Sequence, residues 1–231
     1  TRTPHPLGAQ IADVGGAYVG VMGILAALFK RERSNEGDYL DVALHESAMP
    51  FAMYQFVESL TAGMAGGDGT LTGRMAFYDV YYSQDEQPLV FAAIESKFWA
   101  NFCQAVDKSD WINRHLIPTE QQALKADMVA LFKTKPAAEW DTLLSDADCC
   151  FSLITPPDEL INDPQINARI MAGLDNTGVP WMRSPIRLIS DDTFQLGNAP
   201  QQGEHTLAIL KENGFSDDEI THLKATNIIG K

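Results

Sequence analysis

The sequence is short of positive charge and of cysteine, and each shortage excludes a class of protein. Its 231 residues hold 17 Lys and Arg against 31 Asp and Glu, which gives a net charge of −14. Because nucleic-acid phosphates are bound by clustered Lys and Arg, we expect no nucleic-acid partner. Three cysteines, of which Cys149 and Cys150 are adjacent, fit neither a disulfide framework nor a regular metal site. We therefore expect no metal, and a reducing cytoplasm as the location.

Charge is absent from residues 14–29, and this run predicts a buried helix. Lys30 to Arg33 close it with four charged residues. The run contains four glycines, and each costs about 1 kcal/mol relative to alanine inside a helix, so close packing against their backbone must offset them. A membrane span is the alternative. It needs about 20 apolar residues and Asp13 stands directly at the start, so we expect no membrane insertion.

The remaining pattern predicts an α/β protein in four segments. A strand over residues 39–44 and a helix over 45–61 complete a large-domain segment, 1–61. The glycine-rich residues 62–73 form a linker. A small α/β domain follows over 74–169, with a hairpin of residues 77–83 and 89–93, helices over 97–106 and 119–133 and from Pro136, and a strand over 149–154. Residues 170–231 return to the large domain and end in two helices, the last opened by a Ser216 to Glu219 capping box.

Four blocks of sequence resemble one known family, and they occur in that family's order. Residues 11–48 read IADVGGAYVGVMGILAALFKRERSNEGDYLDVALHESA, and residues 76–99, 163–171 and 197–220 continue the likeness. The chain resembles the class III CoA-transferase (CaiB/BaiF) family and is most similar to its α-methylacyl-CoA racemase branch. The resemblance implies buried helices of a large domain with a small α/β domain inserted. It also implies that an N-terminal α/β half, which holds most CoA contacts in the family, is missing here.

The resemblance assigns roles to a few residues. Asp13 matches the family's catalytic acid, which either moves the α-proton of an acyl-CoA or attacks its thioester as a nucleophile. Glu95 matches a carboxylate of the racemase branch that supports the catalytic histidine, and that histidine lies before Thr1 in the family. Gly15 and Gly16 let the backbone approach the thioester of coenzyme A, which is part of the substrate; we expect no tightly bound cofactor.

Each of these roles has a structural alternative. Asp13 is also a typical helix N-cap, Glu95 a typical first-turn acid, and the glycine pair a typical site of tight helix packing. His205 matches a family block at a helix start, where a packing or capping role is favoured over a catalytic one.

The resemblance leads to an α-methylacyl-CoA racemase-like enzyme, with two alternatives. The first is a CoA transferase with Asp13 as nucleophile and an enzyme-bound CoA thioester. The second is a truncated or non-catalytic product that retains the dimerising body. The family also implies an interlocked homodimer, in which the linker over residues 62–73 carries the small domain to a partner subunit.

Overall fold

The computed structural model describes residues 7–64, 68–188, 197 and 200–230. The chain divides into compact units of residues 1–154 and 155–231. The division falls after Ile154 because helix η5 (Pro157–Asn162), which lies in the expected small domain of 74–169, contacts strand β4 of the second unit. The grouping of 1–61 with 170–231 as one large domain stays a prediction.

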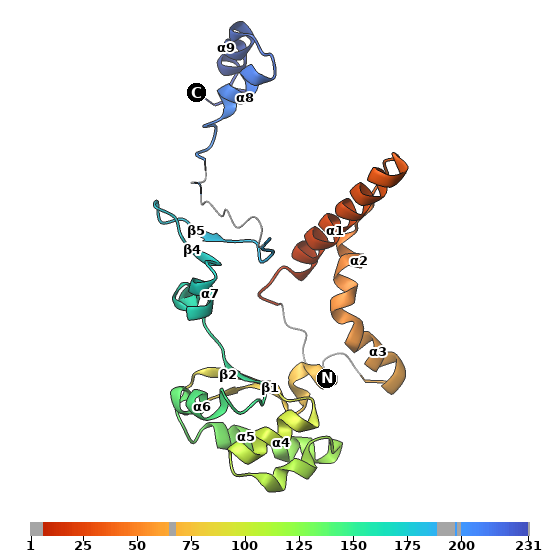
Figure 1. Ribbon diagram of the computed structural model, residues 1–231, viewed down its shortest axis with the longest axis vertical. Helices are drawn as coiled ribbons and strands as arrows, with labels where there is room; N and C mark the ends of the chain where they lie inside the picture. The colour runs from red at the N-terminus through yellow and green to blue at the C-terminus, as the bar shows by residue number, and fades with distance from the viewer. Residues whose placement is uncertain (1–6, 65–67, 189–196, 198–199, 231) are drawn as a thin grey trace. The chain divides into compact units, whose positions relative to one another are not determined.

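Helix α1 (Ile11–Ser34) confirms the helix expected from the uncharged run (Figure 1). It ends at Asn35, which adopts a left-handed conformation with φ 57° and donates its N–H to the Arg31 carbonyl at 2.7 Å. The expected burial is not found within this chain, where only Gly15 and Gly16 of the helix are buried. Most of its other apolar side chains are exposed, whereas a few, such as Ile11 and Val19, are half-buried.

The strand expected over residues 39–44 is absent, and this prediction was wrong. Residues 35–43 have no regular structure, and Tyr39 is 89% exposed. An alternating sequence forms a strand only when another strand satisfies its backbone groups, and none of the described strands pairs with this segment. The expected second helix is present but interrupted, because Pro50 lies in a 3₁₀ turn, η1 (Met49–Ala52), between α2 (Leu44–Ala48) and α3 (Met53–Ala62).

The predicted hairpin is confirmed as the centre of a three-stranded antiparallel sheet. Strand β1 (Tyr78–Tyr82) pairs with β2 (Pro88–Ala92), which pairs with β3 (Phe151–Leu153). Helices pack around it in the lower part of Figure 1: η2 (Thr70–Arg74), α4 (Ser96–Ala105), η3 (Ser109–Arg114), η4 (Pro118–Glu120), α5 (Gln121–Phe132) and α6 (Ala137–Leu144).

Aromatic side chains hold this sheet and its helices together. The ring of Phe91 on β2 lies 4.4 Å from that of Phe102 on α4 and 6.4 Å from that of Phe132 on α5. Phe132 in turn lies 5.2 Å from Trp140 on α6. All four side chains are at most 1% exposed. The sheet and the helices α4, α5 and α6 therefore share one continuous hydrophobic core.

The second unit is built from short elements. A two-stranded sheet pairs β4 (Ala172–Leu174) with β5 (Pro180–Met182). Asp163 caps α7 (Pro164–Ala168), and α8 (Thr206–Glu212) and α9 (Asp217–Ala225) follow. The predicted capping box at α9 is confirmed: the Ser216 hydroxyl accepts from the Glu219 N–H, and the Glu219 carboxylate accepts from the Ser216 N–H at 2.8 Å.

We predict that Gly15→Val lowers stability more than Gly20→Val. A Cβ at Gly15 would lie 2.9 Å from Phe51 Cε2 and 3.5 Å from the Ser47 carbonyl, whereas a Cβ at Gly20 meets nothing within 4 Å. Both variants carry the same helix propensity, so their difference, about 1 to 3 kcal/mol, reports packing alone. Urea unfolding followed by circular dichroism measures it. Equal midpoints would show that the contact between α1 and α2 does not constrain position 15.

We also predict that stability falls below about pH 6.5 through His115. Burial lowers the pKa of His115, against a smaller upward effect of its hydrogen bond to Ala93. The unfolded chain, with a histidine pKa near 6.5, then takes up a proton that the folded chain does not, so the free energy of unfolding decreases as the pH falls. Comparing urea midpoints at about pH 7.5 and about pH 5.5 in the wild type and in His115→Gln checks this. An unchanged pH dependence in the variant would contradict it.

Candidate active site

Asp13 lies at the start of α1 with its carboxylate exposed and free. The N-cap of the helix is Gln10, whose carbonyl accepts from the Val14 N–H at 2.9 Å. Asp13 is the third helical residue, so the alternative of an Asp13 N-cap was wrong. Its side chain makes no hydrogen bond or ion pair with any residue that the structure describes. The positive end of the helix dipole, about half an elementary charge, lies at this carboxylate.

Gly15 and Gly16 bring α2 against the first turns of α1. A Cβ at Gly16 would lie 2.5 Å from Leu44 Cδ2, so only a residue without a side chain admits Leu44 in this position. The close helix packing expected of the glycines is therefore confirmed at Gly15 and Gly16, whereas at Gly20 it is not found, because a Cβ there would meet nothing within 4 Å. Their approach to a CoA thioester stays a prediction.

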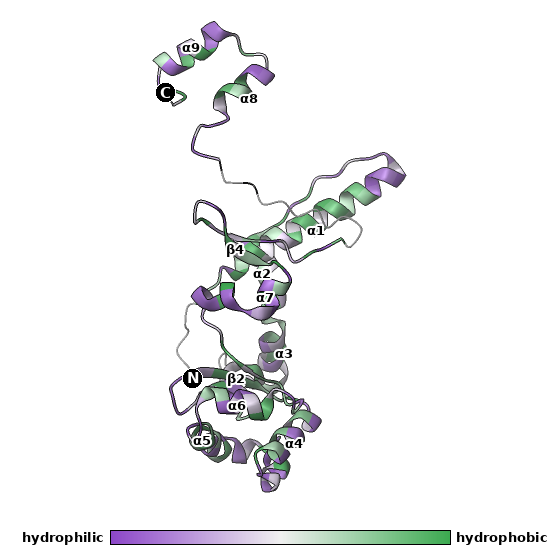
Figure 2. Cartoon of the chain, turned by 60° about the vertical axis from the view of Figure 1, so that its left-hand side comes forward, coloured by the Kyte–Doolittle hydropathy of each residue, from purple (hydrophilic) through white to green (hydrophobic). Residues whose placement is uncertain are grey.

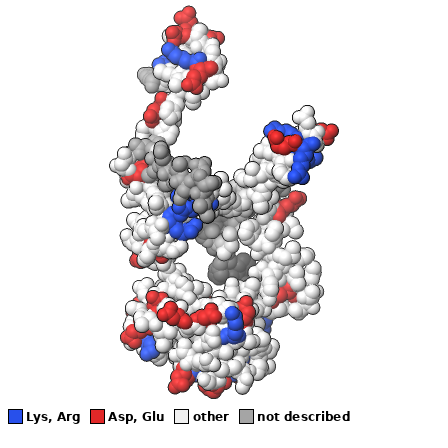
Figure 3. All heavy atoms as spheres, in the orientation of Figure 1, with Lys and Arg blue, Asp and Glu red and all other residues white. Residues whose placement is uncertain are grey.

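An uncovered apolar surface extends from Asp13 along α1. Val14, Tyr18 and Val21 are each at least half exposed, and Figure 2 shows the helix as hydrophobic along its length up to a polar end. Figure 3 shows charged side chains gathered at that end. By length and composition α1 could cross a membrane, and 11% of its most apolar 18-residue window is buried within the chain.

Glu95 occupies the N-cap position of α4. Its backbone carbonyl accepts from the N–H groups of Phe98 and Trp99, at 3.0 and 3.2 Å, while its side chain makes no capping hydrogen bond and is exposed. Burial, and to a smaller extent the negative charge of Glu95, raises the pKa of the Cys150 thiol. Asp13 and Glu95 belong to different elements, and their convergence in one site stays a prediction.

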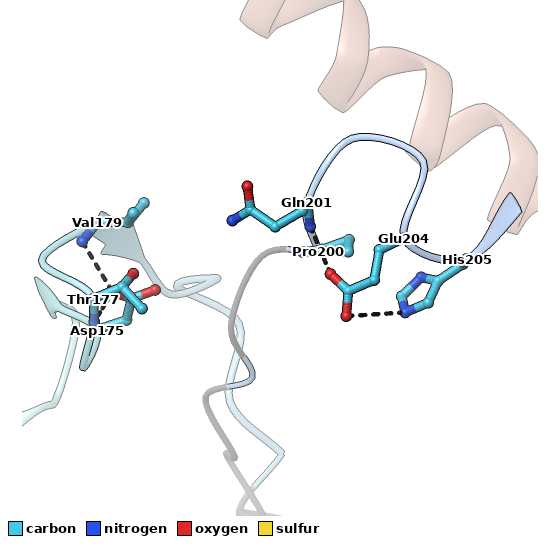
Figure 4. Close-up of a pocket in the computed structure, with 7 residues that line it drawn as sticks. All are labelled: Asp175, Thr177, Val179, Pro200, Gln201, Glu204 and His205. Atoms are coloured by element: carbon cyan, nitrogen blue, oxygen red, sulfur yellow. Dashed lines mark hydrogen bonds and ion pairs between the residues drawn. The ribbon is translucent and has the colours of Figure 1, made fainter. Parts of the chain in front are cut away.

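His205 lies in a polar pocket of the second unit (Figure 4). It is the N-cap of α8 without a side-chain cap bond, and its Nε2 is 3.9 Å from Glu204 Oε1. The pocket is lined by Asp175, Thr177, Val179, Pro200, Gln201, Glu204 and His205.

The two carboxylates of this pocket stabilise turns. Asp175 Oδ1 accepts from the Thr177 N–H, the Thr177 hydroxyl and the Val179 N–H, and these bonds, that of the Thr177 hydroxyl first, lower the pKa of Asp175. Glu204 Oε2 accepts from the Gln201 N–H at 2.7 Å. Across the described residues no group of three or more His, Cys, Asp or Glu could hold a metal ion.

Sequence reasoning missed one residue, His115. It is 4% exposed, and its ring lies among the aromatic side chains of the first unit. No local signal marks it, because its partners Phe77, Ala93 and Trp99 lie far away in the sequence.

Comparison with known proteins decides the family. Residues 1–206 match CoA-transferase family III. The chain belongs to this family. The expected family of the chain and its expected mixed helix-and-sheet fold are confirmed. A CaiB/BaiF family protein from Brucella suis superposes with a TM-score of 0.71 at 23% identity, covering 91% of this chain and 57% of that one. A hypothetical protein from Mycobacterium tuberculosis gives a TM-score of 0.70 at 22% identity, over 90% and 57%. These two show the fold alone.

The curated relatives of this CoA-transferase family III chain include both racemases and CoA-transferases. α-Methylacyl-CoA racemases of Mus musculus and Homo sapiens are 25% and 26% identical, over 99% and 97% of the chain. The acetyl-CoA:oxalate CoA-transferase of Acetobacter aceti is 25% identical over 89% of the chain and 54% of its own length. The chain spans about 60% of the length of the racemases, at 61% and 60%.

Proposed function

We propose that this chain belongs to an acyl-CoA-handling enzyme that moves the α-proton of a 2-methylacyl-CoA, as in α-methylacyl-CoA racemase. The observation that carries the proposal is Asp13, an unpartnered carboxylate at the N-terminal end of a 24-residue helix. The match to the racemases over nearly the whole chain supports it.

The surroundings of Asp13 suit a proton transfer at carbon. A general base accepts a proton in its ionised form, and the positive end of the α1 dipole lies beside this carboxylate. The apolar face behind it, with Val14 and Tyr18 exposed, offers a surface for an acyl chain. Asp13 would take the α-proton and form an enolate of the thioester, and return of a proton to the opposite face would invert the centre. Coenzyme A enters as part of the substrate, and no step requires a tightly bound cofactor.

A CoA transfer reaction is the second candidate, since transferases match the chain at the same identity as the racemases. In that reaction the Asp13 carboxylate attacks the thioester carbonyl and expels the CoA thiolate, which gives a mixed acyl-enzyme anhydride. The thiolate then attacks the Asp13 carbonyl, so that the acyl group leaves as its free carboxylate and an enzyme-bound CoA thioester remains. Racemisation forms no bond to Asp13, so the two chemistries are separable by trapping.

We predict that Asp13→Asn abolishes activity in the intact protein without unfolding it. The amide has nearly the volume of the carboxylate but neither its charge nor its basicity, so proton transfer and nucleophilic attack are both lost. Loss of deuterium from α-deuterated 2-methylacyl-CoA measures the rate. Asp217→Asn is the matched control, because Asp217 is an exposed first-turn acid of α9. A variant retaining most of the wild-type rate would show that Asp13 is not catalytic.

The same preparation distinguishes the two chemistries. Protein incubated with acyl-CoA is treated with hydroxylamine or borohydride and digested, and the peptide carrying Asp13 is analysed by mass spectrometry. An adduct on Asp13 identifies a transferase, whereas deuterium loss without an adduct identifies a racemase.

The site is proposed to be shared between two subunits of a homodimer. Glu95 lies on the first unit's sheet-and-helix part, beyond the glycine-rich residues 62–73, and Asp13 lies before them. Helix α3 ends at Ala62 and η2 begins at Thr70, and the Thr70 hydroxyl donates to the Glu58 carboxylate of α3 at 2.6 Å. About twelve residues span at most about 40 Å when extended, so carrying Glu95 to Asp13 of the partner subunit would require η2 to unfold and this hydrogen bond to break. No membrane attachment is proposed, and the enzyme is assigned to the cytoplasm.

We predict that mixed subunits restore activity. The Asp13→Asn homodimer should be inactive, and the Glu95→Gln homodimer should keep only a small, measurable fraction of the wild-type rate. A heterodimer should regain about half of the wild-type rate, because one of its two shared sites contains both native carboxylates. Co-expression with two different affinity tags, followed by tandem purification, gives the heterodimer. Complementation absent from a correctly folded heterodimer would place both carboxylates of a site in one chain.

A further inference from the structure

His115 is a buried histidine with one defined hydrogen bond. Its Nε2 lies 2.9 Å from the carbonyl oxygen of Ala93. A carbonyl only accepts, so Nε2 carries the proton and Nδ1 is the unprotonated nitrogen. Nδ1 is buried without a hydrogen-bond partner among the described residues. The His115 side chain therefore contributes one N–H donor and the packing of its ring.

The ring of His115 is fixed by two aromatic neighbours. It stacks on Trp99 at a centroid distance of 5.3 Å and an interplanar angle of 6°. Phe77 meets it edge-on at 4.6 Å. Gln121 Nε2 donates to the His115 carbonyl at 2.7 Å, and Gln121 Oε1 accepts from the Ala76 N–H at 3.0 Å. Side chain and backbone of His115 are thus both held by buried groups.

Two of the groups that His115 contacts, the Ala93 carbonyl and the Trp99 ring, lie on either side of Glu95 in the sequence. Ala93 is the last buried residue before the turn into α4, and Trp99 is in the first turns of that helix. The Glu95 carbonyl accepts from the Trp99 N–H. His115 therefore joins the backbone before Glu95 to the helix that begins after it, and so limits the movement of the N-cap residue between them.

We propose that His115 is a positioning residue for Glu95. It holds the Ala93 carbonyl with Nε2–H and the Trp99 ring with its own ring, and so fixes the direction in which the Glu95 side chain leaves the turn. This inference rests on the proposed role of Glu95 in the reaction. His115 itself touches neither substrate nor reacting atoms.

A purely structural histidine would behave like other buried donors of the same core. Trp140 is such a donor: its Nε1 donates to the Phe132 carbonyl at 2.9 Å, and the side chain is 1% exposed. It does not contact Ala93 or Trp99 through any hydrogen bond or ring contact in the described structure. His115→Phe and Trp140→Phe each remove an aromatic N–H donor from a buried carbonyl while leaving a ring in place. The pair separates positioning from general loss of stability.

The experiment measures kcat and KM in the intact protein for Glu95→Gln, His115→Phe, Trp140→Phe and the double variant Glu95→Gln/His115→Phe, below the melting temperature of each. We expect His115→Phe to lower kcat about 10- to 100-fold, as displaced catalytic groups do, with KM nearly unchanged. Trp140→Phe should lower the melting temperature and leave kcat near the wild-type value. In the Glu95→Gln background, His115→Phe should have no further effect on kcat.

A second readout and a second variant complete the test. Hydrogen exchange of the Phe98 and Trp99 amides, which donate to the Glu95 carbonyl, should accelerate in His115→Phe and not in Trp140→Phe. His115→Gln keeps an N–H donor where Nε2 lies and loses the ring, so its kcat should fall less than that of His115→Phe. The same cycle with His115→Gln is used if the Phe variant does not fold.

The outcomes separate the two hypotheses. Full activity of Glu95→Gln would overturn the proposed role of Glu95. If Glu95→Gln is impaired and His115→Phe keeps the wild-type kcat, the positioning role of His115 is overturned while the role of Glu95 stands. The same conclusion follows if the kcat losses of the two single variants multiply in the double variant. Equal kcat losses in His115→Phe and Trp140→Phe would likewise overturn the positioning role, because they would show that His115 acts only through the stability of the core.

Discussion

Aromatic packing around Phe91 is the interaction on which the first unit depends. This ring joins the middle strand of the sheet to α4 and α5, and Trp140 extends the cluster to α6. Aromatic side chains bury about 150 to 250 Å² each, so a few of them provide most of the apolar core of so small a sheet. Helix α4, which begins directly after Glu95, packs on this core through Phe102.

Helix α1, in contrast to this buried aromatic core, is apolar but largely exposed. Its apolar side chains are exposed over most of its length, and only the glycine pair is buried, against Leu44 and Phe51. Monomeric soluble proteins rarely expose large contiguous apolar patches. Asp13 lies at the end of this surface, so the catalytic proposal and the uncovered face of α1 concern the same part of the chain.

The predictions from sequence succeeded where the signal was local. The Ser216 to Glu219 capping box and the hairpin at β1 and β2 each depend on residues a few positions apart, and both are present. The strand expected over residues 39–44 failed because alternation gives a segment one apolar face without supplying a partner strand. The Asp13 cap failed by a smaller margin, since the helix begins before Asp13, at Ile11.

The sequence by itself determined the presence of α1, the hairpin and the family, because spacing, charge and short-range patterns specify them. It also singled out Asp13 and Glu95 as candidates by their resemblance to family positions. Only the tertiary structure decided which apolar faces are covered and which histidine is buried. The reason is that Phe77, Ala93, Trp99 and His115 meet through packing between distant elements, and no pattern within any one of those elements encodes the meeting.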